Sequence, residues 1–168
     1  MPIINNNFKK YIIYLLIFTI IFALDRITKI YILHLAEINN TLDIYITSFL
    51  NFYLIWNKGI AFGLLSFDKN IVYNFITFFI AFVTLIIFII AIKSSDFKGY
   101  LFMVIFSGSI GNLFDRFYFS AVPDFIDFHI NDFHWFIFNV ADIFISLGVI
   151  CLIFVEIFIK KEANDKNL

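Results

Sequence analysis

The sequence predicts an all-α membrane protein with a small β element: four transmembrane helices and a short sheet at the outer membrane interface. The first observation is composition, because 62% of the residues are hydrophobic and 15% are charged, whereas soluble domains have about 45–50% and about 25%. The second is four apolar runs near the length of about 20 residues that a spanning helix needs. The 168 residues are therefore expected to form a single membrane domain, residues 1–168.

The predicted transmembrane helices cover residues 11–33, 71–92, 100–117 and 138–159. The first begins like a secretory signal peptide, with Lys9 and Lys10 before an apolar core, but no small-residue cleavage site follows it. The chain continues instead with "DRITK", so we interpret this segment as a retained helix.

The basic residues predict how the helices are oriented. Lysines gather at both termini and between the second and third helices: Lys9, Lys10, Lys93, Lys98, Lys160, Lys161 and Lys166. Because basic residues favour the cytoplasmic side of a membrane, these segments are expected there. Residues 34–70 and 118–137 are then extracytoplasmic, and both termini are cytoplasmic. The net charge of −1 gives no electrostatic footprint for nucleic acid.

The extracytoplasmic segments have the character of β-strands. In residues 44–63, aromatic and β-branched residues predominate up to a turn-like Asn57-Lys58-Gly59 sequence. In "DFIDFHIND" (124–132), apolar and polar residues alternate with the period of a half-buried strand. These patterns predict a small amphipathic sheet that rests on the outer membrane–water boundary.

Polar residues that are costly to bury converge at one depth, at the outer ends of three helices and just before the second strand. They are Asp25, Lys29, Asn112, Asp115, Arg116, Asn139, Asp142 and Asp124. Within each helix they are three or four residues apart, so they share one helix face. Gly108 and Gly111 precede the group on the third helix and would let a neighbouring backbone approach closely. The second helix carries no such residue and is expected to be scaffold.

Several of these residues have simpler explanations. Asp25 and Lys29 are expected to pair at a helix end, and Asp115 and Arg116 to form an ion pair or to reach the interface. Four further aspartates are expected to be solvated: Asp43, Asp68, Asp127 and Asp132. The three histidines show no metal-ligand spacing, so neither a metal nor another cofactor is expected.

Asp124 and Asp142 are harder to explain, because no basic residue lies within a turn of either. If they face each other, their carboxyl groups share one proton, so that one takes a proton from water while the other hydrogen-bonds a carbonyl oxygen. The sequence offers no Ser-His, Cys-His or Ser-Lys pattern for a covalent nucleophile. By elimination, the candidate is an aspartyl hydrolase at the outer membrane surface.

Three other functions use carboxylates in a membrane protein. A proton-coupled transporter usually spreads polar residues through the membrane depth and has an internal repeat. A lipid-headgroup transferase that uses Mg²⁺ would lose activity with a chelator. A non-catalytic assembly factor would tolerate asparagine at positions 124 and 142.

Four sequence blocks together resemble the lipoprotein signal peptidase (signal peptidase II) family of aspartyl membrane proteases. They are "DRITK" (25–29), "NKGIAFG" (57–63), "GSIGNLFDR" (108–116), and "VPDFIDF" with "FNVAD" (122–128 and 138–142). Their order and spacing cover nearly the whole chain. The resemblance implies four membrane helices with a small extracytoplasmic β-cradle, in agreement with the predicted layout.

The resemblance also implies an activity. Such an enzyme cleaves the signal peptide from a prolipoprotein, directly before a cysteine that carries diacylglycerol, in the bacterial cytoplasmic membrane. Its partners are the prolipoprotein substrate and membrane lipid, with no obligate protein partner, and globomycin-type cyclic peptides inhibit the family.

Site residues follow from the matched positions. Asp124 and Asp142 match the catalytic aspartates. Positions that line the site and hold the substrate backbone are matched by Asn57, Asn112, Arg116 and Asn139. Supporting positions are matched by Asp25, Lys29, Gly59, Gly108 and Asp115. The chain departs from the family at Arg26, where a neutral polar residue is expected, and at Pro123, where an aliphatic residue is commoner.

Overall fold

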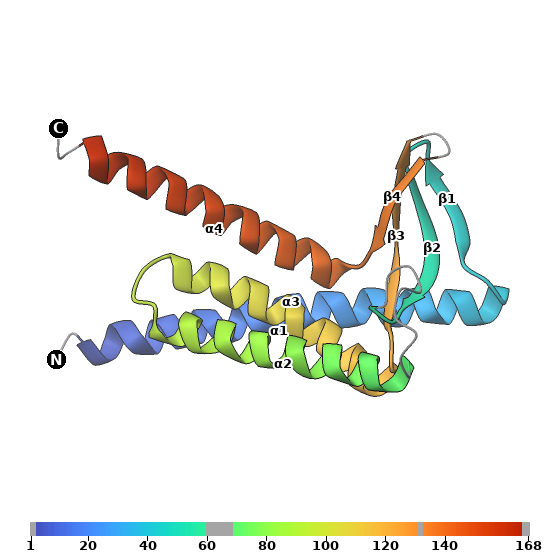
Figure 1. The fold of residues 1–168 in the computed structure, drawn as a ribbon, viewed down its shortest axis with the longest axis horizontal. Coiled ribbons are helices and arrows are strands. Elements are labelled where there is room, and N and C mark those ends of the chain that lie inside the picture. The colour runs from blue at the N-terminus through green and yellow to red at the C-terminus, as the bar shows by residue number, and fades with distance from the viewer. Residues whose placement is uncertain (1–2, 60–68, 131–132, 166–168) are drawn as a thin grey trace.

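The computed structural model describes residues 3–59, 69–130 and 133–165, which form helices and one sheet. In chain order the elements are α1 (Ile3–Asn39), β1 (Asp43–Thr47), β2 (Leu50–Asn57), α2 (Lys69–Lys93), α3 (Lys98–Phe119), β3 (Val122–Ile130), β4 (Phe133–Phe138) and α4 (Val140–Asp165). The sheet stands across one end of the helices, and the first turn of α1 and the last turn of α4 lie at the other end (Figure 1).

Three helices in the described part of the chain are long and apolar enough to cross a membrane. These candidate spans are Asn7–Asn39, Ile71–Lys93 and Val140–Phe158. The remaining helix, α3, packs against α1, α2 and α4 and buries polar side chains such as Ser107 and Asp115. Its lower apolar content follows from this central position, because its polar side chains contact protein. The protein is therefore a mostly helical membrane protein with a small sheet.

The first helix is longer than predicted. It continues beyond residue 33 to Asn39, so the start of the predicted outer segment 34–70 is helical. Residues such as Leu35 and Ala36 favour helix, and no glycine or proline interrupts them. The next residue, Asn40, has a φ of 60°, in the left-handed region that commonly terminates helices.

The sheet is antiparallel, with strand order β1-β2-β3-β4. Strand structure in the segment 44–63 is confirmed as far as Asn57, but the chain turns there and forms two strands, with Thr47 paired to Leu50. The turn residues Ser48 and Phe49 lack the Asn-Gly type of signal that identifies hairpins. Residues 60–63 of that segment lie outside the described residues. β4 is a further difference, because it lies in a segment predicted only as a connection.

The alternation predicted for β3 is present, but its polar face points inward. Phe125 packs inside with Ile32 and Leu42, and the strand period then places Asp127 on the same face. The expectation that Asp127 is solvated is therefore wrong: it is 2% exposed, and His129 Nδ1 lies 3.7 Å from its Oδ2 atom. Phenylalanine and isoleucine side chains occupy the exposed face. Asp43 is exposed as expected, and Asp68 and Asp132 lie outside the described residues.

Candidate active site

Asn139 and Asp142 close the N-terminus of α4 with two reciprocal hydrogen bonds. The Asp142 N–H donates to Asn139 Oδ1 at 3.1 Å, and the Asn139 N–H donates to Asp142 Oδ2 at 3.1 Å. This is a capping-box geometry, and the helix dipole also favours a carboxylate in the first turn. The cap explains how a carboxylate can stand at the start of an apolar helix, and it fixes the direction of the Asp142 side chain.

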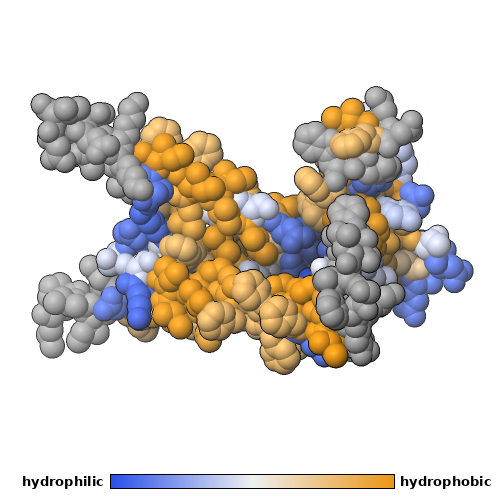
Figure 2. Space-filling view, viewed as in Figure 1, coloured by the Kyte–Doolittle hydropathy of each residue, from blue (hydrophilic) through white to orange (hydrophobic). Residues whose placement is uncertain are grey.

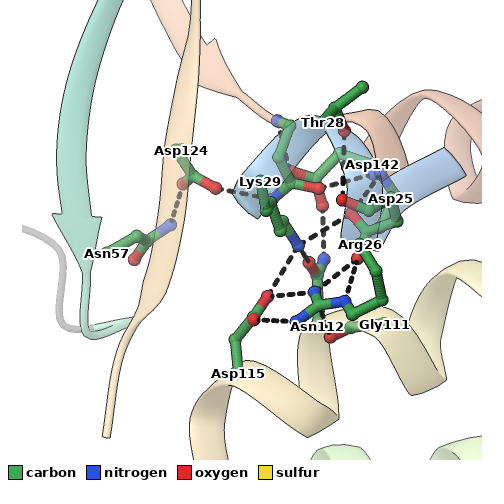
Figure 3. A network of polar contacts seen from close by, with 12 residues as sticks. Asp25, Arg26, Thr28, Lys29, Asn57, Gly111, Asn112, Asp115, Asp124 and Asp142 are labelled. Carbon is green, nitrogen blue, oxygen red and sulfur yellow. Dashed lines mark hydrogen bonds and ion pairs between the residues drawn. The ribbon is translucent and has the colours of Figure 1, made fainter. Parts of the chain in front are cut away.

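Asp124 lies within β3, two residues after the strand begins, and not before the strand as predicted. Its carboxyl group accepts two hydrogen bonds, from Asn139 Nδ2 at 2.6 Å and from Asn57 Nδ2 at 2.9 Å. Figure 3 shows Asn57 beside it, on the neighbouring strand. β4 pairs with β3 only from Ile126 onward, so Pro123 lies where β3 has one neighbouring strand, a position that tolerates proline.

Asp124 and Asp142 line the same cavity, which has a volume of about 240 Å³. The other polar side chains that line it are Asn57, Ser109, Asn112, Arg116 and Asn139. Asn139 contacts both aspartates, with its side chain on Asp124 and its backbone N–H on Asp142. The fold thus brings two carboxyl groups from a strand and a helix to one polar cavity between apolar helices.

Burial raises the pKa of Asp124 from its ordinary value of 3.8 to about 6. The negative charge of Asp142 acts in the same direction, whereas the hydrogen bonds from Asn139 and Asn57 stabilise the carboxylate and oppose the increase. A carboxyl group with a pKa near neutrality can both hold and release a proton under physiological conditions, as a general acid or base requires.

A buried cluster of ion pairs from α1 and α3 lies beside the cavity. Lys29 Nζ is 2.8 Å from Asp25 Oδ1 and 2.6 Å from Asp115 Oδ2. The predicted pairing of Asp25 with Lys29 is therefore confirmed. Asp115, however, pairs with Lys29 and Arg26, and Arg116, its expected partner, lines the cavity instead.

Arg26 gives this cluster a net charge of zero. Its guanidinium donates to both carboxylate oxygens of Asp115, and it also contacts Asp25 (Figure 3). Asp25 and Asp115 are fully buried. Two buried carboxylates with one lysine would leave an unpaired charge, which is costly to bury. Arg26, which stands where a neutral residue was expected, thus balances the charge of the second buried carboxylate.

Hydrogen bonds connect the cluster to the cavity. Lys29 Nζ donates to Asn112 Oδ1 at 2.9 Å, and Asn112 Nδ2 donates to Asp142 Oδ1 at 2.8 Å. The Ala141 N–H at the start of α4 donates to Asp25 Oδ1 at 3.2 Å. The cluster therefore holds the N-terminus of α4, and with it Asp142, against α1 and α3.

Arg116 is a buried cation on the cavity wall. Among the described residues, its Nη1 atom has no hydrogen-bond partner, although the residue is only 8% exposed. Gly59 lies against it with a positive φ of 72°, and a Cβ atom there would be 2.9 Å from Arg116 Nη2. The backbone conformation at position 59 thus favours glycine, and a side chain there would displace the guanidinium.

The second helix contributes to the site, contrary to the prediction that it is only scaffold. The Tyr73 hydroxyl donates to the Arg116 carbonyl oxygen at 2.9 Å, and the Tyr73 ring lies 5.6 Å from the guanidinium carbon. Ile80 lines the cavity. Nothing in the sequence indicates this role for Tyr73, because it is one aromatic residue among many in an apolar helix. Arg26 could have been recognised as part of the site, because it is a charged residue next to Asp25.

Close packing of α3 on α4 completes the site. A Cβ atom at Gly108 would lie 2.6 Å from the Ala141 carbonyl oxygen, so the two helix backbones are in direct contact there. This confirms the close approach predicted from the glycine. Because Ala141 precedes Asp142, the contact also sets how deep the Asp142 carboxyl group lies.

A bundle of apolar helices with two aspartates on one polar cavity is the arrangement of a membrane-embedded enzyme of the aspartic type. Comparison with known families identifies the particular one: the signal peptidase (SPase) II family matches residues 17–158. The chain belongs to the signal peptidase II family.

Individual relatives agree with this assignment. The lipoprotein signal peptidase of Pelagibacter ubique is 51% identical over 162 residues, which cover 96% of this chain and 98% of that protein. The lipoprotein signal peptidase of Aquifex aeolicus is 41% identical, over 88% of this chain and 87% of that protein.

Solved structures are similar as well. A bacterial membrane enzyme determined by the in meso method at 2.3 Å resolution superposes with a TM-score of 0.65 and 28% identity, over 90% of each chain. A second such enzyme, at 1.9 Å resolution, gives 0.62 and 30%, over 84% of this chain and 90% of the other.

Proposed function

We propose that this protein is an aspartic-type endopeptidase that removes the signal peptide from prolipoproteins, directly before the diacylglyceryl-modified cysteine. We further propose that Asp124 and Asp142 are its catalytic residues. Membership of the signal peptidase II family supports the activity. The observation that carries the assignment of residues is that both carboxyl groups line one cavity and contact the same asparagine.

The proposed reaction needs no covalent intermediate. A water molecule between the two carboxyl groups gives a proton to the ionised one and attacks the peptide carbonyl carbon, while the protonated one donates a hydrogen bond to the carbonyl oxygen. The proton then passes to the leaving nitrogen as the C–N bond breaks. Burial raises the pKa of Asp124 to about 6, and substrate that fills the cavity removes further water from it, which favours a pair that holds one proton.

Neutral amides and one cation are proposed to hold the extended substrate backbone. Asn57, Asn112 and Asn139 already donate hydrogen bonds to the two aspartates, and a substrate carbonyl oxygen can accept from the same groups. Arg116 lines the cavity, and among the described residues its buried Nη1 atom has no hydrogen-bond partner, which favours a role in binding a substrate carbonyl oxygen. Gly59 and Gly108 support this arrangement through close contact, and Asp25, Lys29 and Asp115 through the ion-pair cluster.

The proposed setting is the bacterial cytoplasmic membrane, with residues 1–168 as one domain and α3 as a fourth span. α3 has 22 residues, about 33 Å of helix, enough to cross a hydrocarbon core of about 30 Å. The lysines at the ends of the helices support a cytoplasmic location of both termini. The sheet then forms the extracytoplasmic cradle, and the cavity lies at the outer leaflet, where acyl chains would anchor the lipidated cysteine.

The test is cleavage of a purified diacylglyceryl-modified prolipoprotein by the wild type and by Asp124→Asn and Asp142→Asn. Each variant is expected to lose at least about 1,000-fold in kcat, because the amide can neither accept nor donate the shared proton. Activity should be unchanged by EDTA.

Asp43→Asn is the matched control, since this exposed aspartate lies on β1, and it is expected to retain full activity. Undiminished cleavage by either active-site variant would move the catalytic role to another carboxylate. Loss of wild-type activity with EDTA would favour a metal-dependent reaction.

A further inference from the structure

A second polar cavity lies at the end of the helices opposite the sheet. It has a volume of about 640 Å³, and three lysines, Lys9, Lys10 and Lys93, are among the residues that line it. Ser94, Ser95 and Tyr100 add hydroxyl groups. Lys10 precedes Asp25 on α1 by 15 residues, or about 22 Å of helix, so this cavity is separate from the catalytic one.

The lysines give this cavity a strong positive charge. Lys10 Nζ donates to the carbonyl oxygens of Ile92 and Ser94, at 2.7 and 2.6 Å, which leaves its third proton for another acceptor. Lys9 and Lys93 are exposed. No carboxylate is among the described residues that line the cavity, although Asp96 lies in the same connection. Figure 2 shows the hydrophilic patch at this end, bordered by apolar surface.

An apolar groove continues from the cavity along the helices. It has a volume of about 350 Å³ and shares Tyr11 and Ile92 with the lysine-lined cavity. α1 and α2 both pack on α3, and the groove runs between them with α3 as its floor. The residues that line the groove include Leu15 and Phe18 from α1, Phe88 from α2, and Met103 and Phe106 from α3.

We infer that the cavity and the groove form one binding site for an anionic phospholipid of the adjacent leaflet. The phosphate lies at the three lysines, and one acyl chain lies in the groove. Basic pockets between membrane helices favour anionic headgroups, whereas the cation of a zwitterionic headgroup would meet three ammonium groups. The general preference of lysines for the cytoplasmic side explains why they gather at this end. It does not explain why they line a cavity, or why an apolar groove adjoins that cavity.

Lipid binding to the purified full chain tests this inference. Native mass spectrometry in neutral detergent compares dioleoylphosphatidylglycerol with dioleoylphosphatidylcholine, and the anionic lipid is expected to bind at least about 10-fold more tightly. The double variant Lys9→Gln/Lys93→Gln keeps the contacts of Lys10 and should weaken binding of the anionic lipid by about 30-fold. Lys98→Gln removes one positive charge at the same end but outside the cavity, and should change binding less than about threefold.

A second pair of variants tests the groove. Leu15→Trp fills it from an exposed position and should weaken binding of both lipids, whereas Leu16→Trp, which is also exposed but does not line the groove, should have no effect. Equal affinity for the two lipids, or an unchanged affinity in the lysine double variant, would overturn the inference. Competition by glycerol phosphate as strong as by the phospholipid would do so as well, because it would indicate a site for a free anion.

Discussion

Asp124 is a carboxyl group buried in the fold, so its ionisation opposes folding. Its pKa is 3.8 in an unfolded chain and about 6 in the protein. Below pH 3.8 Asp124 is protonated in both the folded and the unfolded state, so its ionisation does not affect the free energy of unfolding. Between these values only the unfolded state loses its proton, so stability falls as pH rises, by about 3 kcal/mol in total, and then stays constant above the folded value.

The Asp124→Asn variant should therefore become more stable relative to the wild type as pH rises from 4 to 7.5. The change in the difference between their melting temperatures is expected to be about 5–10 °C for a chain of this size. Thermal unfolding in detergent, followed across this pH range, measures it. The difference profile cancels any constant cost of the substitution and the titrating groups that do not interact with Asp124. A flat profile for Asp124→Asn would contradict the assigned burial effect.

Asp127 shows where sequence reasoning about single residues fails. It and Asp43 are both aspartates in strand-like segments, yet one is 2% exposed and the other is on the surface. Asp127 is buried because it shares a face of β3 with Phe125, which packs in the core. An alternating sequence pattern shows that a strand has two different faces, but not which of them the rest of the protein buries. The same limit applies to Tyr73, whose role depends on a neighbouring helix.

At the scale of elements, the contact between α3 and α4 sets the position of Asp142. Gly108→Ala places a methyl group 2.6 Å from the Ala141 carbonyl oxygen, so the helices must move apart. A displacement of about 1 Å in a catalytic group can lower the rate by about 100-fold. We expect kcat to fall by about 10–100-fold with a small change in KM, measured with the prolipoprotein cleavage assay.

Gly148→Ala is the matched control at the same interface. Its Cβ atom would lie 2.5 Å from Ile105 Cγ1, a comparable steric conflict, but six residues, or about 9 Å of helix, away from Asp142. The two variants should lose similar melting temperature, and Gly148→Ala should keep most of its kcat. Equal losses of kcat would mean that the interface acts through general stability and not through the placement of Asp142.

The helices were predicted well, because their hydropathy signal extends over many residues. The strands and their turns were predicted less well, because their signal is confined to a few residues. The helices follow from hydropathy over about 20 residues, and only their ends differ, as at Asn39. β4 and the turn at Ser48-Phe49 were missed, because no glycine or proline separates these strands from the ones before them. The sheet as a whole was expected, but its division into strands depends on pairing that the sequence does not display.

At the scale of the whole molecule, the site depends on contacts between segments far apart in the chain. The meeting of polar faces from three helices was predictable, because costly groups at one membrane depth must find one another. Which side chains contact one another was not predictable. The packing of α1, α3, β3 and α4 brings together Arg26 with Asp115 and Asn139 with Asp124. The resemblance to a family supplied the matched site positions, but not the contacts between them.

The proposed orientation of the molecule makes the last prediction. The ends of α1 and α4 that lie away from the sheet, together with the connection between α2 and α3, should face the cytoplasm (Figure 1). After replacement of the native Cys151 by alanine, Thr41→Cys and Ser95→Cys report on the two sides, since both positions are exposed. A membrane-impermeant maleimide added to intact spheroplasts should label Thr41→Cys and not Ser95→Cys, and both should be labelled after the membrane is permeabilised. Labelling of Ser95→Cys alone would invert the topology and place the catalytic cavity at the inner leaflet, where a lipidated substrate on the outer leaflet would not reach it.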